Sequence, residues 1–216
     1  MKRALILALA LAGVLSGVTN AAHAQDAQRG SGKVAMCEGC HQILGYQTSF
    51  PKAYKVPLIA GQDAKYIASA LKAYRAGDRK QTQMRAIAGS LTDADIDEIA
   101  AHYSTLGKPE GPVPKALEKP LPAALQAKVA TCVACHGANF STPTDGTIPR
   151  LAGQYGDYLY FALRAYGTEG NEHFGRNNAL MAPMAKMLSD DEAHEFTAYL
   201  ASLPGELRLV QDPRFK

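Results

Sequence analysis

The sequence predicts an all-α protein made of two similar domains, and three observations support this fold class. Apolar residues recur at helical spacing in both halves, and neither half contains a convincing strand pattern. Two segments of about 80 residues carry the same motifs in the same order. Between them lie residues 107–122, where five prolines remove backbone donors and fix φ, as in a semi-extended linker.

The helical pattern is clearest in the middle of each half. The segment DAKYIASALKAYRAG, residues 63–77, has an apolar stripe at positions i, i+1, i+4, i+5 and i+8. The stripe and its counterpart in the second half consist of Tyr66, Ile67, Ala70, Leu71 and Tyr74, and of Tyr158, Leu159, Ala162, Leu163 and Tyr166. The last helix of the first half is predicted to start at Thr92, with Asp95 as its capping-box partner. Ser189 and Glu192 stand in the same relation in the second half.

The internal duplication defines the predicted domains. GKVAMCEGCHQ aligns with AKVATCVACHG, VPLIAGQ (56–62) with IPRLAGQ (148–154), and MRAIAGSLTDADI (84–96) with MAPMAKMLSDDEA (181–193). The repeats run from about residue 27 to 106 and from about 123 to 203. We therefore expect an N-terminal domain over 25–106, a linker over 107–122 and a C-terminal domain over 123–216.

The first 24 residues have the pattern of a secretory signal peptide. Lys2 and Arg3 precede an apolar run from Ala4 to about Val18, and Ala22-His23-Ala24 fits the small-x-small cleavage rule. The run is shorter than the roughly 20 residues of a membrane-spanning helix, so an uncleaved anchor is the weaker interpretation. The sequence predicts export, with cleavage after Ala24.

All four cysteines of the chain lie in two copies of Cys-x-x-Cys-His, within MCEGCH (36–41) and TCVACH (131–136). This is the attachment signature of c-type haem, because two thiols on one helical turn can form thioethers with the vinyl groups of one porphyrin. The adjacent histidine then lies under the iron as the proximal ligand. The sequence predicts two covalently bound haem c groups, attached through Cys37, Cys40, Cys132 and Cys135, with His41 and His136 as iron ligands.

Three other interpretations of the cysteines stay open. Two disulfides would be the usual expectation for four cysteines in an exported protein. A thioredoxin-like redox pair would need a βαβ context, which the helical pattern does not offer. A zinc site shared by both cysteine pairs is conceivable, but it leaves the two equally placed histidines unexplained.

A haem iron with one histidine needs a second axial ligand or an open position. A methionine thioether raises the potential and suits electron transfer. A lone methionine is usually a core filler, but Met84 and Met181 align in the repeats, each seven residues before the leucine of LTDAD or LSDDE. They are the predicted iron ligands. Met184 and Met187 align with residues that cannot ligate, and are expected to pack.

Three histidines are alternatives to these methionines as iron ligands. His102 aligns with Tyr199 on the terminal helix, which favours aromatic packing. His194 aligns with Asp97 on an acidic stretch and is expected to be exposed. His173 lies in TEGNEHFGR (168–176), an insertion found only in the second repeat, and is the strongest rival ligand.

These motifs, in duplicate and in this order, resemble the diheme cytochrome c4 family across essentially all of the mature sequence. The resemblance implies two tandem cytochrome-c domains related by a pseudo-twofold axis, each around one haem. It also implies that Pro57 and Pro149 sit beside the proximal histidines, where a backbone carbonyl can orient the imidazole. Arg79 and Arg176 would face haem propionates, or would simply be surface charges. Gln42 departs from the glycine that commonly follows the motif.

The function implied by the resemblance is that of a periplasmic electron carrier, not an enzyme. The expected donor is a quinol-oxidising complex or a dehydrogenase, and the expected acceptor is a terminal oxidase; peripheral docking to a membrane complex is compatible with this role. A net charge of +3 gives no reason to expect nucleic acid, and filled axial positions leave no site for a small-molecule substrate. Two rivals are the diheme subunit of a larger oxidoreductase, such as a sulfide-oxidising flavocytochrome, and a diheme peroxidase.

Overall fold

A computed structural model of the chain describes residues 32–107, 111–117 and 119–213. The predicted signal peptide and its cleavage site lie outside these residues. The chain divides into two units between Cys37 and Glu38, and the larger unit, which begins at Glu38, holds both motif histidines and the helices that pack around them.

The described residues are mostly helical, which confirms the predicted all-α class. The first half contains α2 (Gly32–His41), α3 (Ala64–Ala76), α4 (Thr82–Gly89) and α5 (Asp93–Thr105). The second half contains the short 3-10 helix η1 (Ala123–Leu125), α6 (Gln126–His136), α7 (Gly156–Tyr166), α8 (Met181–Lys186) and α9 (Asp190–Ala201).

The expectation of no strand is wrong in one detail. Two-residue strands, β1 (Gln47–Thr48) and β2 (Tyr54–Lys55), pair antiparallel in the first half. A strand of two residues is too short to show the alternation of apolar and polar side chains by which strands are recognised in a sequence.

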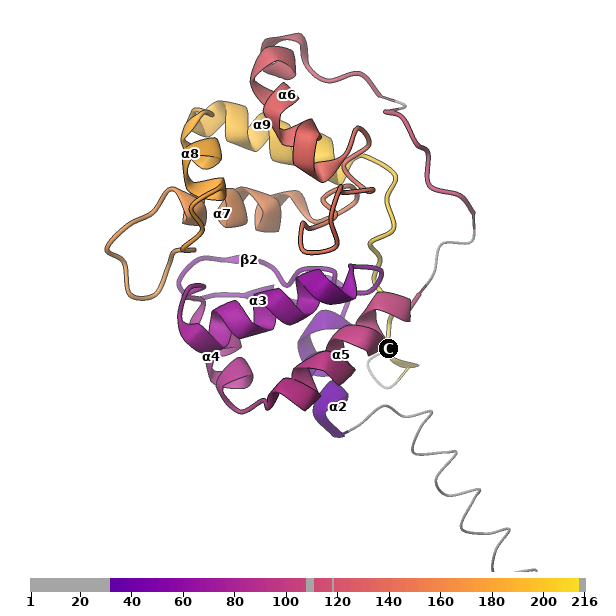
Figure 1. Cartoon of the computed structure of the whole chain (residues 1–216), viewed down its shortest axis with the longest axis vertical. Helices are drawn as coiled ribbons and strands as arrows, with labels where there is room; N and C mark the ends of the chain where they lie inside the picture. Colours follow the sequence, from indigo (N-terminus) through magenta and orange to yellow (C-terminus); the bar gives the residue numbers. More distant parts are fainter. Residues whose placement is uncertain (1–31, 108–110, 118, 214–216) are drawn as a thin grey trace, which may run out of the picture. The chain divides into compact units, whose positions relative to one another are not determined.

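The two halves use the same helix pairing. In the first half α3 packs on α5 and α4, and in the second α7 packs on α9 and α8 (Figure 1). Equivalent backbone hydrogen bonds confirm the repeat alignment: the Gly61 N–H donates to the Tyr103 carbonyl, and the Gly153 N–H donates to the Leu200 carbonyl, both at 3.0 Å. The duplication therefore extends from sequence motifs to tertiary contacts.

Both predicted capping boxes are present. The Thr92 hydroxyl accepts from the Asp95 N–H at the start of α5, and the Asp95 carboxylate accepts from the Thr92 N–H. Ser189 and Glu192 make the same reciprocal pair at the start of α9. These caps fix where the last helix of each half begins.

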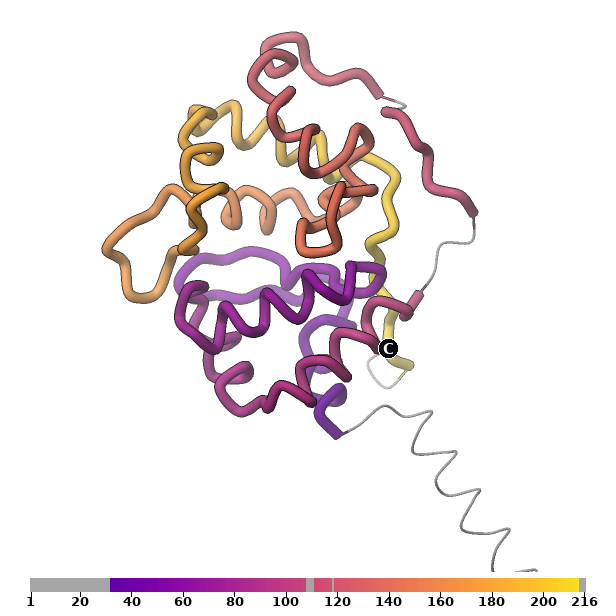
Figure 2. The backbone as a smooth tube through the Cα atoms, viewed as in Figure 1, coloured from indigo at the N-terminus to yellow at the C-terminus, as the bar shows by residue number. Residues whose placement is uncertain are grey.

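The chain after α9 returns to the first half. It runs as an extended segment beside α5 (Figure 2), and the Arg208 N–H donates to the Ala60 carbonyl at 3.3 Å. At Gly61, where φ is 82°, a Cβ atom would lie 2.1 Å from the Glu206 carbonyl oxygen, so only glycine allows this approach. The C-terminal segment thus fastens the two halves to each other.

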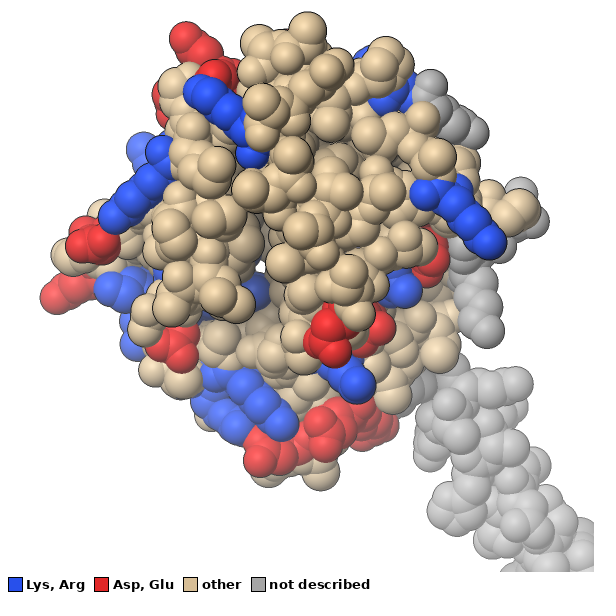
Figure 3. All heavy atoms as spheres, turned by 45° about the horizontal axis from the view of Figure 1, so that its top comes forward, with Lys and Arg blue, Asp and Glu red and all other residues tan. Residues whose placement is uncertain are grey.

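The side of the surface drawn in Figure 3 gives no sign of a binding face of one charge. On the side drawn in Figure 3, Lys and Arg are interspersed with Asp and Glu around a mostly uncharged centre. Within the described part of the chain, no helix combines the length and the apolarity that crossing a membrane would need.

Candidate haem sites

Each Cys-x-x-Cys-His motif lies at the C-terminal end of a helix. His41 is the last residue of α2, and His136 is the last residue of α6. Residues three and four positions apart share a helical face, so each motif places two thiols and one imidazole on one face. The chain leaves α6 through Gly137, whose φ of 82° favours glycine and turns the backbone away from the helix.

None of the four cysteines, all of which lie in the described part of the chain, is joined to another in a disulfide. Cys132 is half-buried, and burial raises the pKa of its thiol, whereas Cys135 is exposed. In the ranges that the structure describes, no group of three or more His, Cys, Asp or Glu side chains is placed to hold a metal ion. The disulfide and shared-zinc interpretations therefore gain no support.

A proline carbonyl orients each motif histidine. His41 Nδ1 lies 2.7 Å from the Pro57 oxygen, and His136 Nδ1 lies 2.9 Å from the Pro149 oxygen. Donation from Nδ1–H fixes the tautomer whose Nε2 lone pair is left for a metal. The structure thus brings each predicted proximal histidine to the proline carbonyl that the family resemblance implies.

The environment of both imidazoles suits ligation. Burial lowers the pKa of His41 and of His136, and the hydrogen bond to the proline carbonyl opposes this effect only in part. Both rings are therefore neutral at pH 7, which is the form that binds iron. Among the features of the site, this matched pair is the most specific.

The two candidate methionines occupy equivalent positions. Met84 lies in the first turn of α4, and Met181 is the first residue of α8; both are half-buried. The backbone N–H of Met84 donates to the side-chain oxygen of Gln81 at 2.7 Å, and that of Met181 donates to Asn178 at 2.9 Å. In each half an amide three residues earlier therefore fixes the backbone of the methionine.

The rival histidines lie in other surroundings. His102 on α5 is half-buried and packs edge-on against Tyr103, with ring centroids 5.1 Å apart. The predicted exposure of His194 is confirmed, since 61% of its side chain is accessible while the ring stacks on Tyr160. His173 is also exposed, and its ring packs edge-on against Phe50, with the ring centroids 5.3 Å apart.

Arg79 and Arg176 form a matched pair, joined to each other as an antiparallel β-bridge. Arg79 donates to the Tyr66 hydroxyl and Arg176 to the Tyr158 hydroxyl, each at 3.1 Å. The surface-charge interpretation is wrong for Arg79, which is only 9% exposed. Each guanidinium also lies over the rings of two tyrosines, which are Tyr66 and Tyr74 for Arg79 and Tyr158 and Tyr166 for Arg176.

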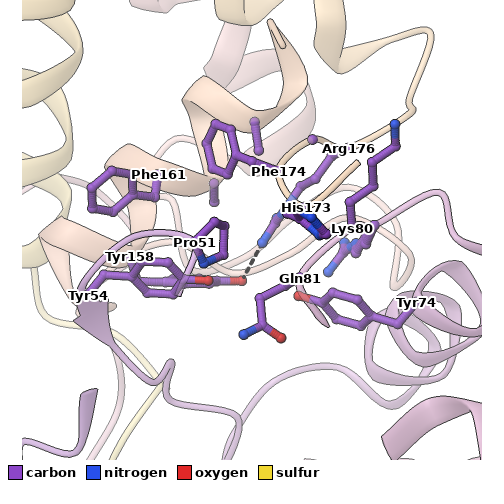
Figure 4. A pocket seen from close by; sticks show the side chains of 14 residues that line it. Pro51, Tyr54, Tyr74, Lys80, Gln81, Tyr158, Phe161, His173, Phe174 and Arg176 are labelled. Atoms are coloured by element: carbon purple, nitrogen blue, oxygen red, sulfur yellow. Dashed lines mark hydrogen bonds between the residues drawn. The ribbon is translucent and has the colours of Figure 1, made fainter. Parts of the chain in front are cut away.

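These arginines line a pocket shared by the two halves (Figure 4). Lys80 and His173 join them, Tyr54, Phe161 and Phe174 supply aromatic walls, and no Asp or Glu is among the lining residues. Several cationic groups without a carboxylate partner suit an anion in a partly apolar setting. The thiols, the oriented imidazoles and the thioethers of the two halves are the kinds of donor that a covalently attached haem requires.

Gln62 and Gln154 end the two aligned motifs VPLIAGQ and IPRLAGQ, and no functional role was predicted for them from the sequence. In the structure both are buried, and each side chain bonds the backbone of the opposite half, Gln62 at Arg150 and Gln154 at Leu58. The signal that could have found them is a polar side chain preserved in both copies of an otherwise apolar motif.

Comparisons with known proteins point to c-type cytochromes. The cytochrome c family matches residues 124–204. Cytochrome c4 of Stutzerimonas stutzeri is 29% identical to this chain, and the match covers 87% of this chain and 94% of that protein. A thiosulfate dehydrogenase electron acceptor of Stutzerimonas stutzeri strain A1501 is 32% identical, and the match covers 82% of this chain and 83% of that protein. The structure of cytochrome c4 from Acidithiobacillus ferrooxidans superposes with a TM-score of 0.57 at 28% identity, over 78% of this chain and 99% of that one.

Proposed function

The chain belongs to the diheme cytochrome c4 family, and on that premise we propose which residues hold its two haem c groups. The protein is a diheme electron carrier rather than an enzyme. Cys37 and Cys40 would hold the first haem through thioethers, and His41 and Met84 would bind its iron. The second haem has the corresponding set, namely Cys132, Cys135, His136 and Met181.

The matched imidazole–proline bonds are the observation that carries this assignment. When bound, each haem supplies an iron that changes between the ferric and ferrous states by one electron. The thiols tether the group, the neutral imidazole donates to the metal, and the thioether sulfur favours the reduced state. Arg79 and Arg176, which line the shared pocket, would offset the charge of haem propionates if these reach it.

Haem content tests the assignment directly. Mature protein purified from an export-competent host should show a mass increment of two haems, and both should remain after denaturation because thioethers are covalent. A single haem, or haem that is extracted on denaturation, would contradict it.

The domain boundaries and the location belong to the same proposal. The mature chain starts at Gln25 in the periplasm, with cytochrome c domains over 25–106 and 123–216 joined by residues 107–122. Sequencing the N-terminus of the exported protein tests the cleavage site. A chain that still begins at Met1 and stays with the membrane fraction would contradict it.

The partners are redox proteins. For the donor, the proposal is a quinol-oxidising complex or a dehydrogenase, and for the acceptor a terminal oxidase. The similarity to a thiosulfate dehydrogenase electron acceptor favours one dehydrogenase in particular, an enzyme that oxidises thiosulfate. Mixing oxidised cytochrome with such an enzyme and thiosulfate should reduce both haems, whereas reduction only by a quinol-oxidising complex would select the other donor.

A further inference from the structure

Gln62 and Gln154 connect the two halves reciprocally, and they are only 4% and 3% exposed. Gln154 Oε1 accepts from the Leu58 N–H at 2.9 Å, and Gln154 Nε2 donates to the Leu58 carbonyl at 2.8 Å. Gln62 makes the same two bonds with Arg150, at 3.0 and 3.1 Å. Leu58 and Arg150 are themselves equivalent in the repeats, so the four bonds obey the pseudo-symmetry of the duplication.

Each glutamine reaches the peptide group that orients the histidine of the opposite half. The Leu58 N–H and the Pro57 carbonyl belong to one peptide group, whose oxygen lies 2.7 Å from His41 Nδ1. The π electrons of a peptide group are delocalised, so a hydrogen bond donated by its N–H makes its carbonyl oxygen a stronger acceptor. Gln154 therefore strengthens the bond that holds the His41 imidazole.

The second half repeats this arrangement in the opposite direction. The Arg150 N–H, which donates to Gln62, shares its peptide group with the Pro149 carbonyl, 2.9 Å from His136 Nδ1. Each glutamine oxygen also accepts the N–H of the next residue, Asp63 or Tyr155, at the start of the following helix of its own half. Only the bonds across the halves lead to an imidazole.

We infer that Gln62 and Gln154 are positioning residues, each of which tunes the proximal histidine of the opposite haem site. The inference rests on the proposed assignment of His41 and His136 as iron ligands. A stronger Nδ1–H···O=C bond makes the imidazole a better electron donor, which favours ferric iron. Gln154 thus lowers the reduction potential at the His41 site, and Gln62 lowers it at the His136 site.

Gln154→Met in the full-length holoprotein removes the hydrogen bonds and keeps a side chain of similar length. In the ferrous protein the His41 Nδ1–H resonance should move upfield and exchange faster with solvent, and the potential at that site should rise. The His136 resonance and its potential should change much less. Gln62→Met should give the mirror result, with His136 responding.

Two further variants separate tuning from simple loosening of the structure. Gln126→Met is the matched control, because Gln126 on α6 donates to the Leu121 carbonyl and bonds neither proline-containing peptide group; both resonances should stay in place. Gln154→Glu keeps the length of the side chain, and its carboxyl, which burial keeps neutral, can still accept from the Leu58 N–H and donate to the Leu58 carbonyl. The His41 resonance and potential should therefore stay close to those of the wild type.

The outcomes are distinguishable from failure of the ligand assignment. Shifts of the same sign and size in Gln154→Met and Gln154→Glu, or equal shifts at His41 and His136 in Gln154→Met, would overturn the cross-half tuning while both iron-bound histidines remain visible. Absence of an iron-bound His41 or His136 in the wild-type spectrum would instead overturn the proposed ligands, and the inference with them.

Discussion

The two halves reach the same imidazole geometry by different routes. His41 is 16 residues before the proline whose carbonyl it contacts, and a β-hairpin fills the interval. His136 is only 13 residues before its proline, and a compact loop replaces the hairpin. The bond lengths nevertheless agree within 0.2 Å, at 2.7 and 2.9 Å. The comparison teaches that the histidine–carbonyl pairing is the constrained feature, whereas the path between its ends is free to vary.

The residue after each motif shows how the routes diverge. Gln42 continues the helical hydrogen bonding of α2, with its N–H donating to the Glu38 carbonyl, and its side chain is buried. Gly137 makes the equivalent bond, its N–H donating to the Val133 carbonyl at 3.0 Å, but it adopts a positive φ, and a Cβ atom there would lie 2.1 Å from the Thr142 carbonyl oxygen. The departure of Gln42 from the family pattern is thus a consequence of a different chain path after the motif.

The largest expected effect is loss of one haem from one half. Replacing Cys132 and Cys135 together by alanine should leave a single haem on the chain and destabilise the C-terminal half, because domains of about 80 residues have little core of their own. Mass spectrometry and hydrogen exchange would measure both effects. Replacing Cys37 and Cys40 is the matched variant, and persistence of two haems in either variant would contradict the attachment sites.

A change of axial ligand should be smaller and confined to one haem. Met84→His and Met181→His should each abolish the weak near-red absorption of methionine-bound ferric haem at one site and lower its potential, because imidazole stabilises the ferric state relative to a thioether. Met184→His serves as the control in the second half. If Met184→His changes the spectrum and Met181→His does not, the register of the second repeat is wrong.

Asn139 holds together the loop that follows the second motif, where the second half differs from the first. Its side chain is buried, accepts from the Ser141 and Thr142 N–H groups at 3.0 and 2.9 Å, and donates to the Pro114 carbonyl at 2.7 Å. Asn139→Ala leaves these groups without partners and should cost about 2–3 kcal/mol of unfolding free energy. Denaturant unfolding would measure the loss, and an unchanged midpoint would show that the loop is not needed for the fold.

The two capping boxes should contribute about equally to the stability of their halves. Thr92→Ala and Ser189→Ala each remove a side-chain acceptor at a helix start and should each cost about 1 kcal/mol. Thermal unfolding of the two variants and of the double variant would compare them. A difference of more than about twofold between the single variants would show that the last helices do not contribute equally.

The sequence by itself determined the features whose signals are local or repeated. Cys-x-x-Cys-His, the apolar stripe and the capping boxes each extend over fewer than about 15 residues, so spacing alone indicates the helix and the chemistry. The duplication then related one half to the other, and it selected Met181 over Met184 as the predicted ligand. Equivalent contacts of α3 with α5 and of α7 with α9 confirm that the two halves are built alike, while the choice of Met181 stays a prediction.

Only the tertiary structure decided which distant groups meet. No periodicity indicates that Gln154 bonds a residue 96 positions earlier, or that Arg79 is buried on tyrosine rings rather than solvated. Such pairings depend on how two amphipathic halves dock, and the energy of a buried hydrogen bond is realised only when both partners leave water together. The two-residue strands could not be predicted for a related reason. They are defined by hydrogen bonds between two segments of the hairpin and not by a pattern of residues within either segment.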